Sequence, residues 1–198
     1  MPPLTLLTPP LTLLTPPLTL QPPLTRRGSG KVSSEKPNAA AFWQTKSLPD
    51  MTPQEWESLC DGCGKCCLHK LLDERDDLPE DAPMQLGEDL HYTHVACKLL
   101  NTEQGGCRHY PIRHRFVPGC VQLTADDLDS IHYMPPSCAY RRLHEGRGLP
   151  SWHPLLHDGS RAAMEAAGMA VTGYPVTSDE RDEPSEATIV TWPLHDCD

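Results

Sequence analysis

The chain has 198 residues, a net charge of −10 at pH 7 and a hydrophobic fraction of 38%. With so little apolar content and only two Phe, we expect a core that is too small to be stable without an additional staple. The negative charge argues against nucleic acid or an anionic membrane surface as the main partner, and no apolar run is long enough to predict a transmembrane helix.

Residues 1–40 are predicted to form a disordered tail followed by a linker. A seven-residue repeat, PPLTLLT, begins at Pro2 and fades by Thr25, and its Pro pairs are expected to prevent helices and sheet ladders. The repeat lacks the basic start and the continuous apolar stretch of an export signal, so a reducing cytoplasm is the expected location. Residues 41–198 are then expected to form one cysteine-rich metal-binding domain.

A helix is predicted to begin at Thr52. Thr52 can act as the N-cap, Pro53 suits the first helical position, and Glu55 completes a capping box. Trp56 and Leu59 fall on one side of this helix, which should end at the first cysteine of the chain.

The remainder of the chain predicts short elements joined by many loops. Residues 73–90 are rich in carboxylates and predict an exposed loop, whereas HYTHVACKLL, residues 91–100, has a strand-like character. Further helices are predicted from Thr124 to before Pro135, from Cys138, capped by Ser137, to about Glu145, and over 161–167; residues 170–176 and 187–192 alternate like two strands that pair with each other. The fold class is therefore α+β: a small, loop-rich, metal-stapled domain with short helices and a small sheet.

Nine cysteines dominate the chemistry, and four of them lie in the stretch CDGCGKCC, residues 60–67. Cys60, Cys63 and Cys66 have the two-residue spacing that lets three thiolates converge on one centre, while Gly62 and Gly64 permit the positive φ values of a tight loop. Adjacent cysteines do not readily form a disulfide, because their Cα atoms are about 3.8 Å apart. Together with the expected reducing compartment, this favours a metal site over disulfides.

A fourth ligand must be Cys67 or a distant residue. The distant candidates lie beside turn-forming residues and are Cys97, Cys107, Cys120 and Cys138. These eight cysteines can form two four-thiolate sites, or one centre with spare thiols, while Cys197 is expected to take no part. Thiolate ligands suit both Zn²⁺ and an iron–sulfur cluster, and three close thiols with a remote fourth favour the cluster slightly.

Other side chains near the cysteines are weaker candidates. Residues 108–115 form a basic stretch, with three Arg and two His, whose cations can offset thiolate charge or simply be solvated. His69 is the best additional ligand, and the spacings of the pairs His91 and His94, and His153 and His157, also occur in metal sites. For these histidines, a solvated or hydrogen-bonded ring is the more common outcome.

Four stretches together resemble a known family: WESLCDGCGKCCLHKL, VACKLL, CRHYPIRHRFVPGCVQLT and CAYRRLHEGRGLPSWHPL. They are similar to the YcgN-like uncharacterised bacterial proteins, within the wider group named for the CxxCxxCC motif and described as zinc- or iron-chelating. The resemblance covers residues 42–193 and implies that the eight cysteines from Cys60 to Cys138 are metal ligands. The 1–40 extension lies outside the family pattern, and the 73–90 stretch is longer than usual.

The sequence therefore predicts a cysteine-ligated metal-binding protein with an iron–sulfur or zinc centre and an unassigned biological role. One alternative is a cluster-dependent redox or methyl-transfer enzyme; a related motif occurs in a flagellin lysine methylase, but this chain has no evident S-adenosylmethionine loop. The other alternative is a disulfide-rich interaction module.

Overall fold

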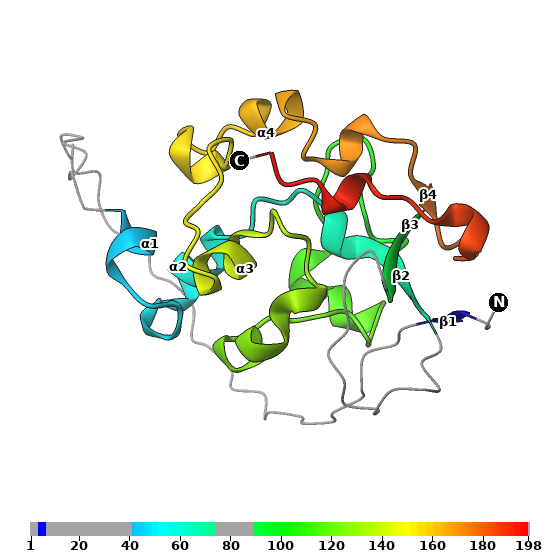
Figure 1. Cartoon of the computed structure of the whole chain (residues 1–198), viewed down its shortest axis with the longest axis horizontal. Coiled ribbons are helices and arrows are strands. Elements are labelled where there is room, and N and C mark those ends of the chain that lie inside the picture. Colours follow the sequence, from blue (N-terminus) through cyan, green and yellow to red (C-terminus); the bar gives the residue numbers. More distant parts are fainter. Residues whose placement is uncertain (1–3, 7–40, 74–88, 198) are drawn as a thin grey trace, which may run out of the picture.

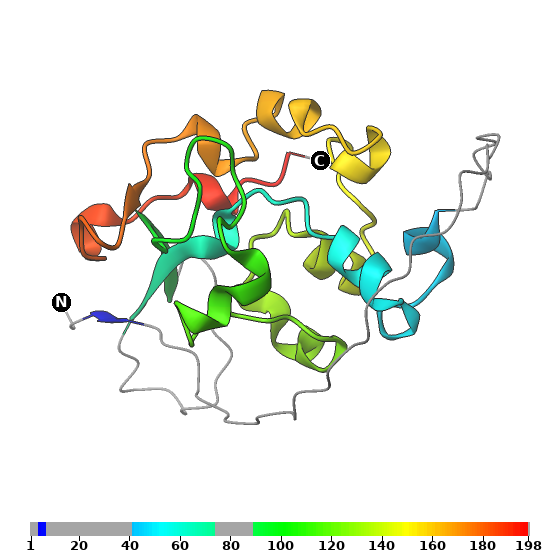
Figure 2. The same cartoon turned by 180° about the vertical axis from the view of Figure 1, so that it is seen from behind.

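The computed structural model describes residues 4–6, 41–73 and 89–197. Figures 1 and 2 show a small sheet at one side of the molecule and the short helices α1 to α3 at the other. The segment that leads from α2 to β2 runs between these two parts, and it carries the CDGCGKCC motif. The α+β class is confirmed, and the motif lies where the two parts meet.

The helical part is built from short elements around the buried Leu59. They are α1 (Phe42–Thr45), η1 (Leu48–Asp50), α2 (Pro53–Ser58), η4 (Ala125–Tyr133) and α3 (Ala139–His144). The predicted capping box of α2 is present: Thr52 Oγ1 accepts from the Glu55 amide at 3.3 Å, and Glu55 Oε2 accepts from the Thr52 amide at 2.8 Å. The Trp56 ring packs against Tyr140, with ring centroids 4.8 Å apart, and ties α2 to α3.

Two other predicted helices form with altered details. The segment that Thr124 caps is a 3-10 helix, whose capping partner is Asp127. The sequence predicted Ser137 as the N-cap of α3. The N-cap is instead Cys138, because the helical conformation starts at Ala139. This shift of one residue places a cysteine side chain at the start of a helix.

The sheet has four strands in the order β1-β2-β3-β4. Its centre is the antiparallel pair of β2 (Leu68–Asp73) and β3 (Leu90–Ala96), and β4 (Thr177–Ser178) runs parallel to β3. The strand character predicted within 91–100 is confirmed. The predicted loop 73–90 is shorter than expected at both ends, since Asp73 and Leu90 belong to strands, and residues 74–88 lie outside the described part.

The two strands predicted near the C-terminus do not pair with each other. Three of the seven residues of 170–176 form the 3-10 turn η6 (Val171–Gly173), and 187–192 joins the sheet only through a single bridge between Ile189 and Thr93. The remaining elements of this region are η5 (Pro154–Leu156), α4 (Ala162–Ala166), η7 (Glu186–Thr188) and η8 (Trp192–Leu194). Alternating apolar residues indicate half-buried chain but do not specify a partner, and here both segments pack against the β2–β3 pair.

Leu4–Leu6 also differs from expectation, because it forms β1 at the edge of the sheet and pairs with β2. Three residues between two Pro pairs are sufficient for an edge strand, where Pro is tolerated. The other residues of the predicted tail and linker lie outside the described part, so the boundary at residue 40 stays a prediction. No helix in the described residues is both long and apolar enough to cross a membrane.

Two further groups of buried side chains contact the cysteine motif. Cys63 packs with Trp152, Met164 and Met169, and of these both Met side chains are fully buried. Another group, around Tyr92 and Val171, packs against Cys67; its buried members are Leu68, Tyr92, Ala96, Leu100 and Val171. The motif is thus packed on both sides by parts of the chain that are distant in sequence.

Candidate metal centre

The loop that follows α2 is shaped by two glycines. Gly62 and Gly64 have φ values of +68° and +83°, as predicted. An added Cβ at Gly64 would lie 2.8 Å from Cγ2 of the buried Val171 and 3.0 Å from Leu100. Glycine is therefore required at position 64 both for its backbone conformation and for the close approach of the core.

Backbone N–H groups point at the first two sulfurs of the motif. The N–H of Gly62 acts on Cys60 and that of Lys65 acts on Cys63, in each case lowering the thiol pKa. Burial outweighs these two hydrogen bonds. It raises the pKa of Cys60 to about 12 and that of Cys63 well above its usual value. Amide hydrogen bonds of this kind stabilise thiolates, so the loop favours ligated, deprotonated sulfur while disfavouring a free thiolate.

Cys66 is the common neighbour of the other thiols. Its own pKa is raised first by a hydrogen bond with the adjacent Cys67 and then by desolvation. The negative charge of Cys66 is in turn among the causes that raise the pKa values of four other thiols: Cys60, Cys63, Cys120 and Cys138. Cys60 and Cys66 nevertheless keep solvent-exposed surface, which gives the group an opening to solution.

Cys138 joins this group from the start of α3. Burial raises its pKa, while the backbone N–H groups of Arg141 and Tyr140 oppose that rise. Lys65 Nζ, within the CDGCGKCC loop, donates to Ser137 Oγ at 3.0 Å, which places Cys138 beside that loop although about 70 residues separate them in sequence. The charges of Asp61 and Cys66 add to the rise in the pKa of Cys138. We name Cys60, Cys63, Cys66, Cys67 and Cys138 the loop group.

The other three predicted ligands form a second set, which we name the distal group: Cys97, Cys107 and Cys120. The Cys97 amide donates to the carbonyl of Cys67 at 2.9 Å, and an isolated bridge pairs Cys107 with Leu100. Burial is the main cause that raises the pKa of Cys97 and of Cys120; the charges of Cys120 and Cys107 add to the rise at Cys97, and the charge of Cys107 adds to the rise at Cys120. The charge of Cys66 also adds to the rise in the pKa of Cys120, which relates the distal group to the loop group.

The basic stretch divides into one buried cation and an exposed remainder. Arg113 is buried, donates to the carbonyl of Tyr110 at 2.9 Å, and lowers the pKa of Cys120 by its charge and by a hydrogen bond. Arg108, Arg115, His109 and His114 are exposed. The expectation that a cation from this stretch offsets thiolate charge therefore holds for Arg113.

Asp61 is a residue that the sequence reasoning passed over. Its Oδ1 accepts from the Cys63 amide at 2.9 Å, whereas its Oδ2 is buried without a hydrogen-bond partner. The charge of Asp61 raises the pKa values of Cys60, Cys63 and Cys138. An unpartnered buried carboxylate among thiols is unfavourable unless a cation is present, so these residues fit a metal ion. Its position between two predicted ligands was the only sequence signal.

Two lysines lie beside the same loop. Lys65 is fully buried, and its Nζ donates to Ser137 Oγ at 3.0 Å and to the carbonyl of His195 at 3.4 Å. Lys70 lies over the ring of Tyr92 and donates to the carbonyl of Cys66 at 3.4 Å. Burial lowers the pKa of both lysines, and the charges of Cys63 for Lys65 and of Cys66 for Lys70 oppose that change. Such cations offset the negative charge that several thiolates would bring.

Each candidate histidine has a partner within the protein. Nε2 of His69 lies 3.0 Å from Asp179 Oδ2, and Nε2 of the buried His153 lies 3.0 Å from the carbonyl of Leu59. His91, His94 and His157 contact Asp73, Asp182 and the carbonyl of Ser151, respectively. Hydrogen bonds within the protein occupy four of these five rings, whereas His94 lies 3.9 Å from Asp182, too far for a hydrogen bond.

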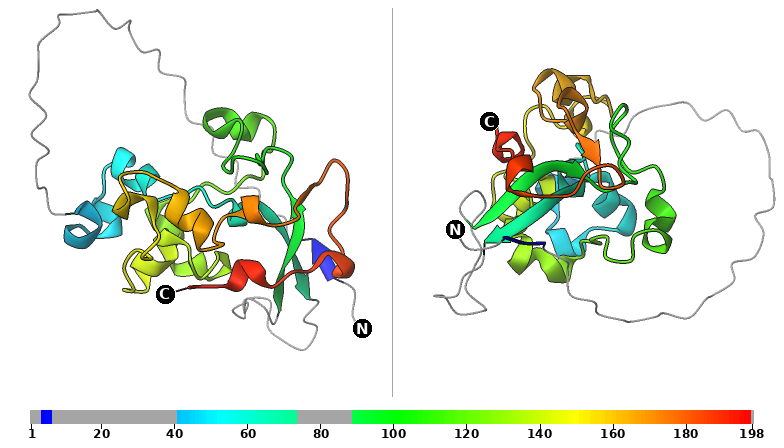
Figure 3. Two further views of the ribbon diagram at one scale, coloured as in Figure 1. Left: turned by 90° about the horizontal axis from the view of Figure 1, so that it is seen from above. Right: turned by 90° about the vertical axis from the view of Figure 1, so that its right-hand side faces the viewer.

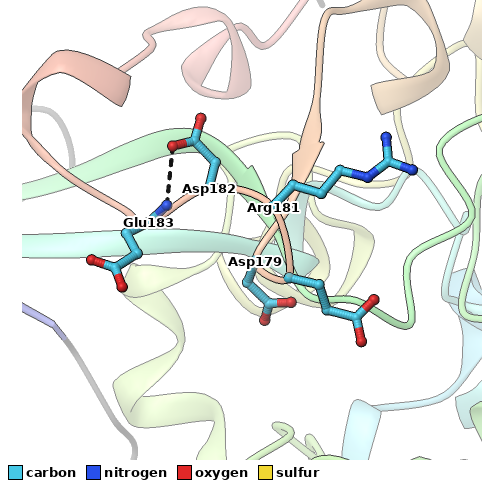
Figure 4. Close-up of a pocket in the computed structure, with 5 residues that line it drawn as sticks. Asp179, Arg181, Asp182 and Glu183 are labelled. Carbon is cyan, nitrogen blue, oxygen red and sulfur yellow. Dashed lines mark hydrogen bonds between the residues drawn. The ribbon is translucent and has the colours of Figure 1, made fainter.

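A pocket of about 440 Å³ lies at the loop after β4 and contains no cysteine. It is lined by residues 179–183, which are mostly acidic, and Figure 4 shows the Glu183 amide donating to Asp182 within the same turn. The thiols, and not this pocket, carry the distinctive chemistry of the chain.

In the part of the chain that the structure describes, the eight predicted ligands do not form a closed site. All nine cysteines are free thiols. In the described part of the chain, no three His, Cys, Asp or Glu side chains are arranged to hold a metal ion. A metal bound here would therefore have to draw the sulfurs closer together.

Comparisons with known proteins agree with the resemblance seen in the sequence. The family described as "CxxCxxCC: Putative zinc- or iron-chelating domain" matches residues 59–139. A UPF0260 protein of Shewanella oneidensis is 51% identical over 158 residues, which is 80% of this chain and 99% of the relative. A UPF0260 protein of Shewanella amazonensis is 50% identical over 157 residues, covering 79% of this chain and 99% of its own length. No solved structure matches. Each of these relatives is about half identical to this chain over nearly its whole length. The chain therefore belongs to the UPF0260 family and carries its CxxCxxCC domain.

Proposed function

We propose that this protein binds a metal centre through cysteine thiolates and that the centre also stabilises the fold. The observation that carries the proposal is the loop group: thiols from two distant segments surround Cys66, together with the unpartnered carboxylate of Asp61. Bringing several negative groups together in a buried place is costly without a cation.

The ligands in this proposal are the eight predicted cysteines, divided into the loop group and the distal group. Cys60, Cys63 and Cys66 supply the closely spaced thiolates, and Cys138 or Cys67 supplies a fourth to the same centre. Cys97, Cys107 and Cys120 either complete that centre or hold a second one near it. Arg113, Lys65 and Lys70 reduce the net negative charge of the ligated sulfurs.

For the identity of the centre we favour an iron–sulfur cluster over zinc. Three closely spaced thiols with a remote fourth suit a cubane, and hydrogen bonds to sulfur tune such clusters. The N–H groups aimed at Cys60, Cys63 and Cys138 support this choice. When bound, the cluster would supply electron-transfer chemistry, while this chain's residues hold it, shield it and set its charge environment.

The test is anaerobic purification followed by an absorption spectrum and analysis for iron, sulfide and zinc. Broad visible absorption with iron and acid-labile sulfide would support the cluster. A colourless protein with bound zinc would support metal binding but replace the cluster by closed zinc sites. A chain that contains neither metal, and whose thiols are oxidised in the cell, would overturn the whole proposal.

A further inference from the structure

Arg161 connects the CDGCGKCC loop, which carries four cysteines of the loop group, with the turn before Cys107 of the distal group. Its Nη1 donates to the carbonyl of Gly62 at 3.0 Å, in the middle of the CDGCGKCC loop. Its guanidinium also lies against Gly105, two residues before Cys107. One side chain therefore contacts both cysteine-bearing loops.

A side chain at either glycine would have to displace the guanidinium of Arg161. An added Cβ would lie 2.7 Å from Nη1 at Gly62 and 2.1 Å from Nη2 at Gly105. Both glycines also have positive φ, +68° and +73°. The turn that contains Gly105 is built independently, because the Gly105 amide donates to the carbonyl of Asn101 at 2.8 Å.

Arg161 is itself held in place by buried structure. It is the N-cap residue of α4, and Met164 of that helix is fully buried in the group that contains Cys63 and Trp152. Figure 3 shows α4 on the outside of the molecule, so its attachment depends on this buried face. Movement of the guanidinium is therefore coupled to the packing around Cys63.

The guanidinium also has unused hydrogen-bonding capacity. Its Nε and Nη2 are buried without a hydrogen-bond partner, and Glu165 Oε1 lies 3.7 Å from Nε, too far for a hydrogen bond. A cation with unmet donors next to the cysteine loops favours negative charge there. Deprotonated, metal-bound thiolates would supply that charge.

We propose that Arg161 is a positioning residue that fixes the Gly62 loop against the Gly105 turn and so sets the distance between the two cysteine groups. This inference rests on the proposed function for its role at a metal centre. The joining of the two loops is a property of the metal-free chain as well.

The first test compares Arg161→Met with a control variant, Arg181→Met. Arg181 is exposed and lies far from both loops in sequence, so the control loses an Arg without loss of the contacts at Gly62 and Gly105. In the metal-free chain, hydrogen exchange at residues 61–64 and 104–107 is expected to be faster in Arg161→Met only. In the metal-loaded chain, chelator-driven release is expected to be about 10- to 100-fold faster, as for other losses of outer-sphere support. Arg161→Lys keeps the charge and should recover part of the effect.

Unchanged exchange in Arg161→Met would overturn the inference even if the protein binds metal normally. If the wild-type chain binds no metal, the proposed function fails, whereas the exchange comparison still decides the role of Arg161.

A double-mutant cycle covers the case in which Arg161→Met does not fold. Gly105→Ala is expected to speed exchange at 61–64 in the wild-type background, because the new methyl displaces the guanidinium. In the milder Arg161→Lys background the same substitution should have a smaller effect, since the lysine has no Nη2 at that position. Equal effects in both backgrounds would contradict the contact between Arg161 and Gly105.

Discussion

The loop group and the distal group reach the same neighbourhood by different means. In the loop group, four of the five cysteines lie within eight residues, and a capped helix, two positive-φ glycines and local amide groups position them. The distal cysteines are separated by long intervals, and a single backbone contact, a β-bridge and a buried Arg position them. The comparison teaches that one half of the site is locally encoded, whereas the other half exists only in the folded chain.

The largest expected effect is the removal of metal from both groups. Because the binding free energy of a metal becomes folding free energy, roughly 10–16 kcal/mol for zinc in zinc-finger peptides, chelation should destabilise the fold by at least several kcal/mol. Thermal unfolding with and without a chelator measures this. A melting temperature that does not respond to chelation, in a chain that demonstrably held metal, would remove the structural role.

Single cysteine substitutions separate the groups. Cys63→Ser should abolish loading of the centre, since Cys63 is buried within the local loop. Cys107→Ser should leave at least part of the metal if the distal group forms a second centre, and should abolish loading if the two groups share one. Metal counted per chain distinguishes the two cases, and Cys197→Ser serves as the control expected to retain full loading.

The raised thiol pKa values predict alkaline destabilisation of the metal-free chain. In the unfolded chain these thiols ionise near pH 9.0, whereas burial keeps Cys63 and Cys138 protonated well above that in the folded chain. The native state then binds more protons, so its stability is full below pH 9 and falls above it. The fall is about 1.4 kcal/mol per pH unit for each such thiol.

Denaturant unfolding between pH 7 and 10.5 tests this expectation. The loop group should dominate the loss, and Cys138→Ala should reduce the slope. Stability that is level or rises across this range would contradict the burial of neutral thiols.

A glycine pair tests the local encoding of the loop group. Gly64→Ala combines a positive φ with an added Cβ 2.8 Å from Val171, and should cost about 2–4 kcal/mol. Gly148→Ala has a similar φ of +73° but no atom within 4 Å, so it should cost only about 1 kcal/mol. Chemical denaturation compares them, and equal costs would mean that the contact with Val171 is unimportant.

The smallest effect is expected at the helix that leads into the loop group. Thr52→Ala removes the side-chain half of the capping box of α2 and should cost about 1 kcal/mol. The loss should appear in urea unfolding and leave metal content unchanged. Ser130→Ala, an exposed hydroxyl outside a cap position, is the control and should cost less.

Features set by neighbouring residues could be predicted from the sequence. The capping box of Thr52 and Glu55, the positive φ of Gly62 and Gly64, and the spacing of the first three thiols depend on contacts within a few residues. The wrong prediction of strand pairing near the C-terminus has another cause. We expected 170–176 and 187–192 to pair with each other, but the Val171 amide donates to the carbonyl of Cys63 and Ile189 bridges to Thr93 of β3, because alternation indicates burial and not the identity of the neighbour.

The sequence by itself therefore determined the CDGCGKCC loop, the helix that precedes it, and membership of a cysteine-rich family, since these are written in local spacing. Three placements followed only from the tertiary structure: Cys138 lies beside that loop, Asp61 lies among the thiols with an unpartnered oxygen, and Arg161 spans the gap between Gly62 and Gly105. Those placements depend on which apolar surfaces pack together over long sequence separations, and the packing brings the polar groups with it.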